Sequence, residues 1–427
     1  MCILNAVRCA FPTCRGFEDG ATLLKPETGD HVRDAVAWAA SEETPLELVG
    51  SGSKRDMGRP GNAAHTLDMS GFTGISLYEA EELVLSAGAA TPIADIHAAL
   101  QAEKQELAFE PPDYGPLLGS AEGLGTLGGV LSANLAGPRR IKVGAARDHF
   151  LGFSAVSGRG ELFKSGGRVV KNVTGYDLCK VMAGSWGTLG AMMQVTVKVL
   201  PAAEKLRTVL VFGCDAVQGV AAMTQALQTP YEVSAAAWLP QNFSGRSRVG
   251  YVQASGSSVT AVRVEGPGPS VEYRCSTLRK QLAAFGETEE LHGQNSAHFW
   301  REIRDVRPFS TSVDARVVWK LSVPPQSGAR LATNLATALG GEFYLDWGGG
   351  LIWLAVPETD GGGNEPIRAA IAQSGGHATL IRAVADLRGA VPVFQPQDPG
   401  LARLSKRLKE GFDPRGILNP GRMYSGV

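Results

Sequence analysis

The sequence predicts an α+β protein built from more than one domain. Apolar residues recur at helical spacing in residues 31–40 and again from Pro92 to Leu100, and strand-like runs separate these two segments. The alternating run Met192–Leu200 ends at Pro201, and a second series of strand-like and helical runs follows it. A chain of 427 residues suits two or three domains, so we place a domain boundary near Pro201.

Composition and charge exclude several classes of protein. The chain is 44% hydrophobic and only 19% charged, which is typical of a packed globular core. A formal net charge of −1 argues against a nucleic-acid partner. No run approaches about 20 consecutive apolar residues, so we expect no membrane span. Residues 1–15 carry Arg8 and three cysteines and do not resemble a signal peptide.

The cysteines do not predict a metal site. None of the six forms a Cys-x-x-Cys pair, so neither a structural zinc site nor an iron–sulfur cluster is supported. Six cysteines in a chain of this length do not indicate a disulfide framework either. We expect reduced thiols and no bound metal.

The first part of the chain reads as strand, helix, strand and turn. A helix is predicted over 31–40 with Asp30 as its N-cap, followed by a strand at Leu46–Val49. Another strand at Leu83–Ala87 precedes a helix that Pro92 opens. Residues 110–150 are rich in Pro and Gly and predict turns. Short strands are then expected at 152–156, 162–165 and 169–172.

The second part predicts a mixed domain without internal repeats. Strands are expected at 207–212, 317–323, 343–347 and 351–356, with a helix at 365–373. The Gly- and Ser-rich stretch 242–269 predicts loops. Residues 401–410 predict a basic amphipathic helix.

Three glycine-rich segments are candidates for cofactor binding. Gly50-Ser51-Gly52-Ser53-Lys54 follows a strand and could turn backbone N–H groups toward a pyrophosphate; a plain turn explains it equally well. Residues 125–137 are small and could lie flat against a large planar ligand, or form a packed turn and helix. The third candidate combines residues 171–177 with the loop 184–190. One extended dinucleotide threaded between the three segments would explain them all.

These residues resemble a known family. Residues 21–201 are similar to the FAD-binding domain shared by vanillyl-alcohol oxidase, p-cresol methylhydroxylase (PCMH) and D-lactate dehydrogenase, through Gly50–Lys54, Thr126–Gly129 and Gly184–Gly190. The resemblance is sharper to the FAD-binding subunits of bacterial glycolate oxidase. It is carried by Glu110-Pro-Pro-x-Tyr-Gly, Leu135-Ala-Gly-Pro-Arg-Arg, Val170-Lys-Asn-Val-Thr-Gly-Tyr-Asp-Leu, Asp346-Trp-Gly-Gly, Gly375-Gly-His-Ala-Thr and Asn419-Pro-Gly-Arg-Met-Tyr.

The resemblance implies a fold and a set of cofactor contacts. A PCMH-type FAD-binding domain of two α+β subdomains (residues 21–201) is followed by an α+β cap domain (202–400). A helix and tail (401–427) then return to the flavin. The implied contacts to FAD come from Gly50, Ser51, Gly52, Ser53, Lys54, Pro112, Thr126, Gly128, Gly129, Ser132, Asn134, Gly137, Gly187, Gly190 and Asn419.

The sequence departs from the family at two points, which concern how FAD is attached and whether the chain can oxidise glycolate alone. Members with covalent FAD carry a His in or near the pyrophosphate loop, where this chain has Ser53, Lys54 and Arg55, so noncovalent FAD is implied. The related catalytic subunits carry a His-rich metal motif in the cap, which this sequence lacks. That absence argues against a chain that oxidises glycolate alone.

Oxidation of a 2-hydroxy acid requires a cation for the carboxylate, a base for the hydroxyl proton and a flavin that accepts hydride. Arg304, Arg307 and Arg382 are cap candidates for the cation, with a structural role as the alternative for each. His377 is the candidate base, or a structural histidine in a glycine turn. Arg139 and Arg140 suit a site near the phosphates, a subunit contact or a solvated loop.

Three functions remain open at this stage. The first is a FAD-binding subunit of a glycolate-oxidising complex, with D-lactate as a further substrate and with a catalytic flavin subunit and an iron–sulfur subunit as partners. The second is a non-catalytic assembly subunit of that complex, and the third is a self-contained D-2-hydroxy-acid oxidase. We expect a cytoplasmic protein that reaches the inner membrane only peripherally, through its partners.

Overall fold

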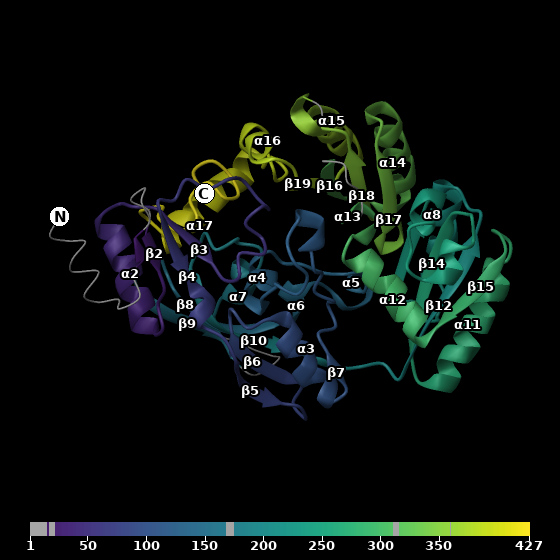
Figure 1. Cartoon of the computed structure of the whole chain (residues 1–427), viewed down its shortest axis with the longest axis horizontal. Helices are drawn as coiled ribbons and strands as arrows, with labels where there is room; N and C mark the ends of the chain where they lie inside the picture. The colour runs from purple at the N-terminus through teal and green to yellow at the C-terminus, as the bar shows by residue number, and fades with distance from the viewer. Residues whose placement is uncertain (1–14, 17–21, 168–174, 311–315, 359) are drawn as a thin grey trace.

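The computed structural model describes residues 15–16, 22–167, 175–310, 316–358 and 360–427 (Figure 1). Helices and strands are mixed throughout, as the α+β prediction requires. The predicted strand at 169–172, residues 171–174 of the third glycine-containing segment, and Cys2, Cys9 and Cys14 lie outside the described residues.

The chain begins with a small sheet covered by a helix. Its four strands have the order β1-β2-β4-β3, and β2, β3 and β4 run parallel. Helix α2 packs its Val32 and Val36 side into the core of this unit. Thr28, and not Asp30 as predicted, is the N-cap, because its side chain accepts the backbone N–H of His31 at 3.2 Å. The bounds are β1 Arg15–Gly16, β2 Thr22–Leu24, α2 Gly29–Ser41, β3 Leu46–Val49, β4 His65–Asp68 and η1 Met69–Gly71.

A five-stranded antiparallel sheet follows, with the order β5-β6-β10-β8-β9. The predicted strands at 46–49, 83–87, 152–156, 162–165 and 192–200 are all present, with ends shifted by a few residues. Residues 110–150 contain four short helical segments: a helix was one predicted alternative for residues 125–137, where Leu127–Ser132 is helical, and the other three were not predicted. The bounds are β5 Ile75–Glu79, β6 Val84–Gly88, α3 Ile93–Ala102, β7 Gln105–Glu106, η2 Pro116–Leu118, α4 Leu127–Ser132, α5 Arg140–Val143, α6 Ala146–His149, β8 Phe150–Val156, β9 Leu162–Gly166, α7 Leu178–Met182, β10 Ala191–Lys198 and β11 Leu200–Pro201.

The C-terminal half is a structural duplication, so the prediction of no internal repeat was wrong at the level of the fold. Its eight-stranded antiparallel sheet has the order β15-β12-β14-β13-β17-β18-β16-β19, and each half of that order is a β-α-β-β-α-β unit. A single pair, Trp238 with Leu345, joins the halves. The first unit is β12 Lys205–Phe212, α8 Ala216–Leu227, β13 Ala235–Leu239, β14 Val259–Gly266, α11 Gly268–Leu282 and β15 Thr288–His292; the second is β16 Val317–Ser322, α14 Pro325–Leu339, β17 Glu342–Asp346, β18 Leu351–Val356, α15 Asn364–Ser374 and β19 His377–Arg382.

The stretch 242–269, predicted as loops, contains the whole of strand β14, which lies between β12 and β13. All six residues of Val259–Val264 are buried, and this burial outweighs the Gly and Ser residues around the strand. The remaining elements are α9 Gln241–Ser244, α10 Gly250–Gln253, α12 Gly293–Arg304, α13 Arg307–Ser310, η3 Trp347–Gly349, η4 Asp360–Gly363, α16 Ala385–Ala390 and α17 Pro399–Phe412.

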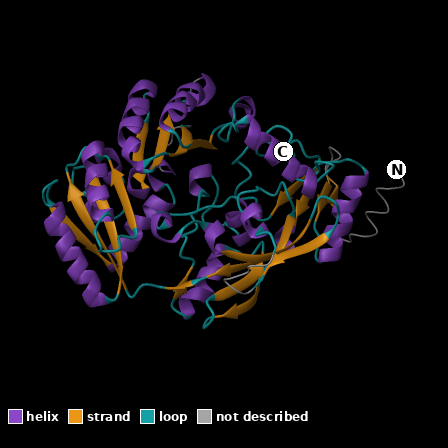
Figure 2. Ribbon diagram, turned by 180° about the vertical axis from the view of Figure 1, so that it is seen from behind, coloured by secondary structure: helices purple, strands orange, loops and turns teal. Residues whose placement is uncertain are grey.

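The eight-stranded sheet uses its two faces differently. Helices α8, α11, α14 and α15 cover one face, and the side chains between them and the sheet form one apolar core. The other face contributes Tyr344, Trp353 and Val318 to a core that it shares with the N-terminal half. Figures 1 and 2 show this sheet and the N-terminal half side by side, with α17 against the N-terminal half and away from α8 and α11.

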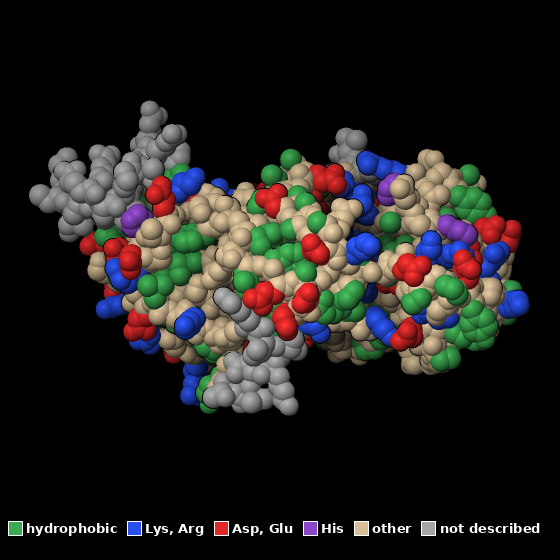
Figure 3. All heavy atoms as spheres, turned by 90° about the horizontal axis from the view of Figure 1, so that it is seen from below, with side chains coloured by type: hydrophobic (Ala, Val, Ile, Leu, Met, Phe, Trp, Pro, Cys, Tyr) green, Lys and Arg blue, Asp and Glu red, His purple; other side chains and the backbone are tan. Residues whose placement is uncertain are grey.

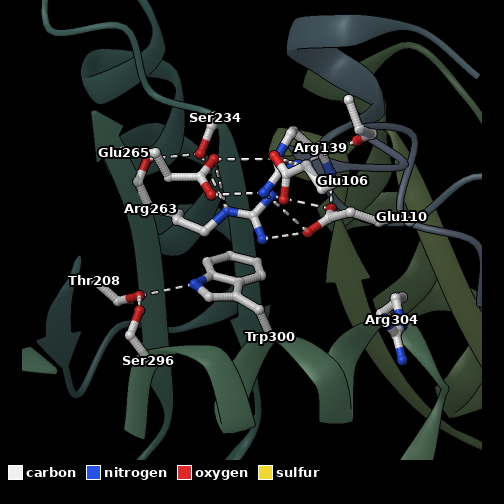
Figure 4. Close-up of polar contacts among 12 residues, drawn as sticks. Glu106, Glu110, Arg139, Thr208, Ser234, Arg263, Glu265, Ser296, Trp300 and Arg304 are labelled. Carbon is white, nitrogen blue, oxygen red and sulfur yellow. Dashed lines mark hydrogen bonds and ion pairs between the residues drawn. The ribbon is translucent and has the colours of Figure 1, made fainter. Parts of the chain in front are cut away.

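A buried ion network connects the two halves (Figure 4). We call it the interdomain ion network: Glu106, Glu110 and Arg139 from the N-terminal half, and Arg263 and Glu265 from strand β14. Arg263 donates to both carboxylate oxygens of Glu110 at 2.7 and 3.0 Å, and only 1% of Arg263 is exposed. Arg139 donates to Glu265 at 2.7 and 3.1 Å and to Glu106 at 2.6 Å. Burial raises the pKa of Glu110, but Arg263 and Arg139 outweigh it and bring the pKa to about 2.

The network explains two of the sequence motifs. Glu110 opens Glu-Pro-Pro-x-Tyr-Gly, and Arg139 belongs to Ala-Gly-Pro-Arg-Arg. Both side chains connect the two halves of the molecule. Arg139 therefore has a structural role, which was not among the alternatives that its sequence context indicated.

Among the described residues, no helix is both long enough and apolar enough to cross a bilayer. Seen from below, acidic and basic side chains are interspersed over the visible face (Figure 3), in keeping with a net charge of −1.

Candidate functional site

Four separated segments meet at one cleft of about 1070 Å³, part of which is open to solvent. They are the loop after β3, the N-terminal turn of α4, the loop before β10, and the tail after α17. Twelve of the fifteen predicted cofactor residues line this cleft: Gly50, Ser51, Gly52, Ser53, Lys54, Thr126, Gly128, Gly129, Ser132, Gly187, Gly190 and Asn419.

The loop after β3 is a tight turn that exposes backbone to the cleft. Gly52 has a φ of +78°, a conformation that glycine adopts without strain. The Ser51 hydroxyl donates to the carbonyl of Leu124, and the N–H of Arg55 donates to the carbonyl of Gly52 at 3.0 Å. The loop is therefore held in one shape before any ligand binds.

Lys54 brings a positive charge into the cleft without a carboxylate beside it. Its ammonium donates to the Ser53 hydroxyl at 3.3 Å, and among the described residues it forms no ion pair. Burial lowers the pKa of Lys54 to about 8, although Asp113 acts in the opposite direction. A partly desolvated cation of this kind fits an anionic group such as a pyrophosphate.

The first turn of α4 presents backbone in place of side chains. The Thr126 hydroxyl caps the helix by accepting the Gly129 N–H at 3.3 Å. A Cβ on Gly128 would lie 2.7 Å from the Ala89 carbonyl oxygen, so only glycine lets the helix approach β6 this closely. This region was predicted as either a ligand platform or a packed small-residue helix, and its geometry combines both.

Asn419 joins two walls of the cleft. Its side-chain amide donates to the carbonyl of Trp186 at 2.7 Å and accepts the N–H of Leu48 at 2.8 Å. Arg422, three residues later, donates to the carbonyls of Lys54 at 2.7 Å and Arg55 at 3.0 Å. The tail therefore fixes the loop after β3, and the cleft is complete only with residues 419–422 in place.

The comparisons agree with this geometry. A family model described as FAD binding domain matches residues 21–166. Over 396 residues the chain is 34% identical to glycolate oxidase subunit GlcE of Escherichia coli (strain K12), a match that covers 92% of this chain and 96% of that protein. This chain belongs to the GlcE family of glycolate oxidase subunits.

More distant relatives support the same assignment. GlcD, a glycolate oxidase subunit of Bacillus subtilis (strain 168), is 23% identical over 454 residues, covering 94% of this chain and 88% of that protein. The crystal structure of p-cresol methylhydroxylase with substrate bound matches with a TM-score of 0.68 at 14% identity, covering 95% of this chain and 88% of that one. The GlcE-family chain is thus a FAD-dependent oxidoreductase with the PCMH-type fold.

Three predicted cofactor residues do not line the cleft of this GlcE-family chain. Pro112 is buried elsewhere. The Asn134 side chain accepts the N–H of Arg147 at 3.0 Å. The carbonyl of Gly137 accepts the indole N–H of Trp347 at 3.1 Å, and a Cβ on this glycine would lie 2.7 Å from the Glu110 carbonyl oxygen. Gly137 therefore contacts the C-terminal half, whereas the bond of Asn134 lies within the N-terminal half.

The cap arginines that sequence proposed are engaged in structural bonds. Arg304 donates to both oxygens of Asp305 at 2.8 and 2.9 Å, and Arg307 forms an ion pair with Glu122 at 2.6 Å. Arg382 donates to three carbonyl oxygens, of Arg316, Leu117 and Phe309. Neither Arg304 nor Arg382 lines the cleft.

A second cationic group, which sequence reasoning missed, lies on the sheet face turned toward the N-terminal half. The Lys320 ammonium lies 5.1 Å from the ring centre of Trp347 and 5.7 Å from that of Trp353. The Arg140 guanidinium lies 4.3 Å from the Trp347 ring on the same patch. We call Arg140, Lys320, Trp347 and Trp353 the cation–aromatic cluster. In the sequence, the charge of Lys320 within the otherwise apolar strand Val317–Ser322 could have indicated a functional cation.

His377 lies on the same face as Lys320. Strands β16 and β19 pair Ser322 with His377 and Lys320 with Thr379, so His377 and Lys320 are diagonal neighbours. His377 is exposed at the start of β19, and partial desolvation of its imidazole, followed by the charges of Lys320 and Arg140, lowers its pKa below the usual value. Burial and the charge of Arg140 likewise lower the pKa of Lys320 to about 8. An anion would relieve the repulsion among these groups.

Replacing Lys54 with Met is expected to weaken FAD binding by roughly 10- to 100-fold. A charge-assisted hydrogen bond contributes about 1.5–3 kcal/mol, and each 1.4 kcal/mol is a factor of about ten. Flavin fluorescence on titration with FAD measures the change. Lys164→Met, on the exposed side of β9, is the matched control and should leave the affinity unchanged. Equal affinity in Lys54→Met and wild type would contradict the assignment of Lys54 to the phosphates.

Proposed function

We propose that this chain is the FAD-binding subunit of a cytoplasmic complex that oxidises glycolate, and D-lactate as a second substrate, to the 2-oxo acid. Its partners in this proposal are a catalytic flavin subunit and an iron–sulfur subunit, through which the complex attaches peripherally to the inner membrane. The main support is the convergence of the glycine-rich segments and Lys54 on one cleft, in a chain that belongs to the GlcE family.

The twelve cleft residues are proposed to hold FAD noncovalently, with Gly50–Lys54 at the pyrophosphate and the first turn of α4 along the flavin. When bound, FAD supplies a hydride acceptor. Gly128 and Gly129 allow backbone to approach it closely, and Lys54 neutralises phosphate charge. The segments are joined by the bonds of Asn419 and Arg422, so the cleft is organised in advance.

The cation–aromatic cluster is proposed to bind the substrate carboxylate. Lys320 and Arg140 supply two positive charges, and the buried faces of Trp347 and Trp353 limit access of water to them. His377 is proposed as the group that accepts the hydroxyl proton. Its lowered pKa keeps the imidazole neutral, and therefore able to accept a proton, at neutral pH.

A relay role is the alternative, in which another subunit oxidises the substrate and this FAD only transfers electrons. A specific observation favours it: Lys320, Arg140 and His377 are not among the residues that line the FAD cleft. A chain that only stabilises the assembly would bind little FAD.

Anaerobic reduction of the flavin distinguishes these functions. The purified chain should show flavin absorbance at about 450 nm. In the intact complex, glycolate and D-lactate should bleach the absorbance of this subunit's flavin, counted per chain. Bleaching by glycolate in the isolated chain would support a self-contained oxidase. Bound FAD that is reduced only when partners are present would support the relay, and a flavin-free chain in an active complex would contradict the proposal.

A further inference from the structure

Helix α17 leaves a row of leucines in solvent. Leu401, Leu404 and Leu408 are 47%, 53% and 38% exposed, and their spacing of three and four residues places them on one side of the helix. Phe412, at the end of the helix, is partly buried and packs on Phe163 at 5.8 Å between ring centres. The leucine row therefore lies beside, and not within, the contact between α17 and the rest of the protein.

Two arginines lie to one side of this row: Arg407 is next to Leu404, and Arg403 is farther round the helix. Arg403 and Arg407 are one turn apart, both are exposed, and neither forms an ion pair within the described part of the chain. The other cation of the exposed side, Lys406, already faces Glu410 at 3.9 Å. We call Leu401, Leu404, Leu408, Arg403 and Arg407 the outer face of α17. It combines apolar side chains with two guanidinium groups that form no ion pair within the described residues, and guanidinium groups can bind carboxylates through two hydrogen bonds.

The inner side of α17 is attached to the walls of the FAD cleft. The buried Lys409 ammonium donates to the carbonyls of Thr188 at 2.8 Å and Leu418 at 2.7 Å, and to Asp413 at 2.7 Å. Thr188 lies between the cleft residues Gly187 and Gly190, and Leu418 precedes Asn419. Figure 1 shows α17 against the N-terminal half, far from α8 and α11. A protein held on the outer face would therefore sit next to the cofactor-binding segments.

We propose that the outer face of α17 is the docking surface for a partner subunit, which receives the leucines in an apolar groove bordered by carboxylates. Anchors at positions i, i+3 and i+7 are how a helix fills a groove in another protein. The row holds no aromatic residue, and aromatic residues are common anchors at a membrane surface. The identity of the partner as the electron-accepting subunit rests on the proposed function; its groove and acidic rim follow from the outer face itself.

The test uses a tagged full-length chain co-expressed with the catalytic flavin and iron–sulfur subunits of its own source. The double variant Leu404→Glu/Leu408→Glu should recover at least about tenfold less of one partner, because both anchors become charged and the carboxylate rim repels them. Its FAD content and melting temperature should match those of wild type. The control Val217→Glu/Tyr273→Glu makes the same change in charge at exposed apolar positions of α8 and α11 and should leave recovery unchanged.

The arginines provide an independent test. Arg403→Glu/Arg407→Glu should reduce recovery of the partner at low salt, whereas Arg403→Lys/Arg407→Lys should retain most of it. Recovery that is the same in the Glu variant and in wild type would remove the acidic rim from the proposal.

Other occupants of the outer face would overturn the proposal, and each has its own readout. If Leu404→Glu/Leu408→Glu recovers both partners at the wild-type level, the proposal is contradicted directly. A dimer of the isolated chain that this variant abolishes would assign the face to a second copy. Flotation with phosphatidylglycerol vesicles that the variant abolishes would assign it to a membrane, and a photo-crosslink from position 404 to residues 1–14 would assign it to the chain itself. None of these readouts depends on hydroxy-acid oxidation, so failure of the proposed function is detected separately.

Discussion

Replacing Arg263 with Met is expected to destabilise the protein by about 3–5 kcal/mol, because it leaves the buried Glu110 carboxylate without its principal partner. Glu110 would keep the backbone N–H of Arg139 at 2.7 Å and a longer ion pair with the Arg139 guanidinium at 3.8 Å. Thermal or urea unfolding of the FAD-loaded protein measures the loss. Arg33→Met is the matched control, since the ion pairs of Arg33 with Asp30 and Asp34 are exposed and contribute little.

The same pair predicts the response to acid. The pKa of Glu110 is about 2 in the folded protein, below its ordinary value of 4.5, so the stabilisation is complete above the ordinary value and is lost as the pH falls toward the lower one. Arg263→Met should flatten this part of the stability profile. Adding Glu110→Gln to Arg263→Met should recover part of the loss, because the unpaired charge is removed. A double variant less stable than Arg263→Met would show that Glu110 does not depend on Arg263.

Replacing Lys320 with Met is expected to lower kcat/KM for glycolate by about 10- to 100-fold, with most of the effect in KM. The side-chain volume on Trp347 and Trp353 is nearly kept, so the change removes the charge that binds the carboxylate. FAD content should not change, because Lys320 does not line the cofactor cleft. Lys280→Met, on the exposed side of α11, serves as the control.

The pH dependence tests the same residue. The pKa of Lys320 is about 8 in the free protein, so kcat/KM should fall as the pH rises through that value and Lys320 becomes neutral. The Met variant should lack this limb of the profile. A wild-type profile that stays flat between about pH 7 and pH 9 would leave Lys320 without a role in substrate binding.

Local patterns predicted the elements that have strong periodicity. The helix at 31–40 and the helix from Pro92 were found because one face of each is apolar and the opposite side is polar, and the strand at 46–49 was found because it is a short apolar run that enters a glycine-rich loop. Strand β14 was missed because six consecutive residues, Val259–Val264, are buried on both faces and show no alternation. The duplication was missed because it is a repeat of topology, and the two units fill the same positions with different side chains.

More residues of the cofactor cleft than of the proposed substrate site could be predicted from the sequence. Glycines such as Gly52 and Gly128 are required by backbone geometry, so the residue type itself marks the position. Arg304 and Arg382 had no such local mark, and only the three-dimensional structure distinguishes an arginine bound to neighbouring carbonyls from one facing a ligand. Lys320 and Arg140 are 180 positions apart in the chain and come together only through the packing of β16 on the N-terminal half.

The bonds of Asn419 and Arg422 have a consequence for biogenesis. Both residues are synthesised after every strand of the duplicated sheet, yet Asn419 binds strand β3 and Arg422 binds the loop that follows it. During translation the ribosome therefore releases the first domain in a form that still lacks one wall of its binding site. FAD loading should accordingly follow chain completion, and arrested nascent chains that stop before residue 419 should retain little flavin.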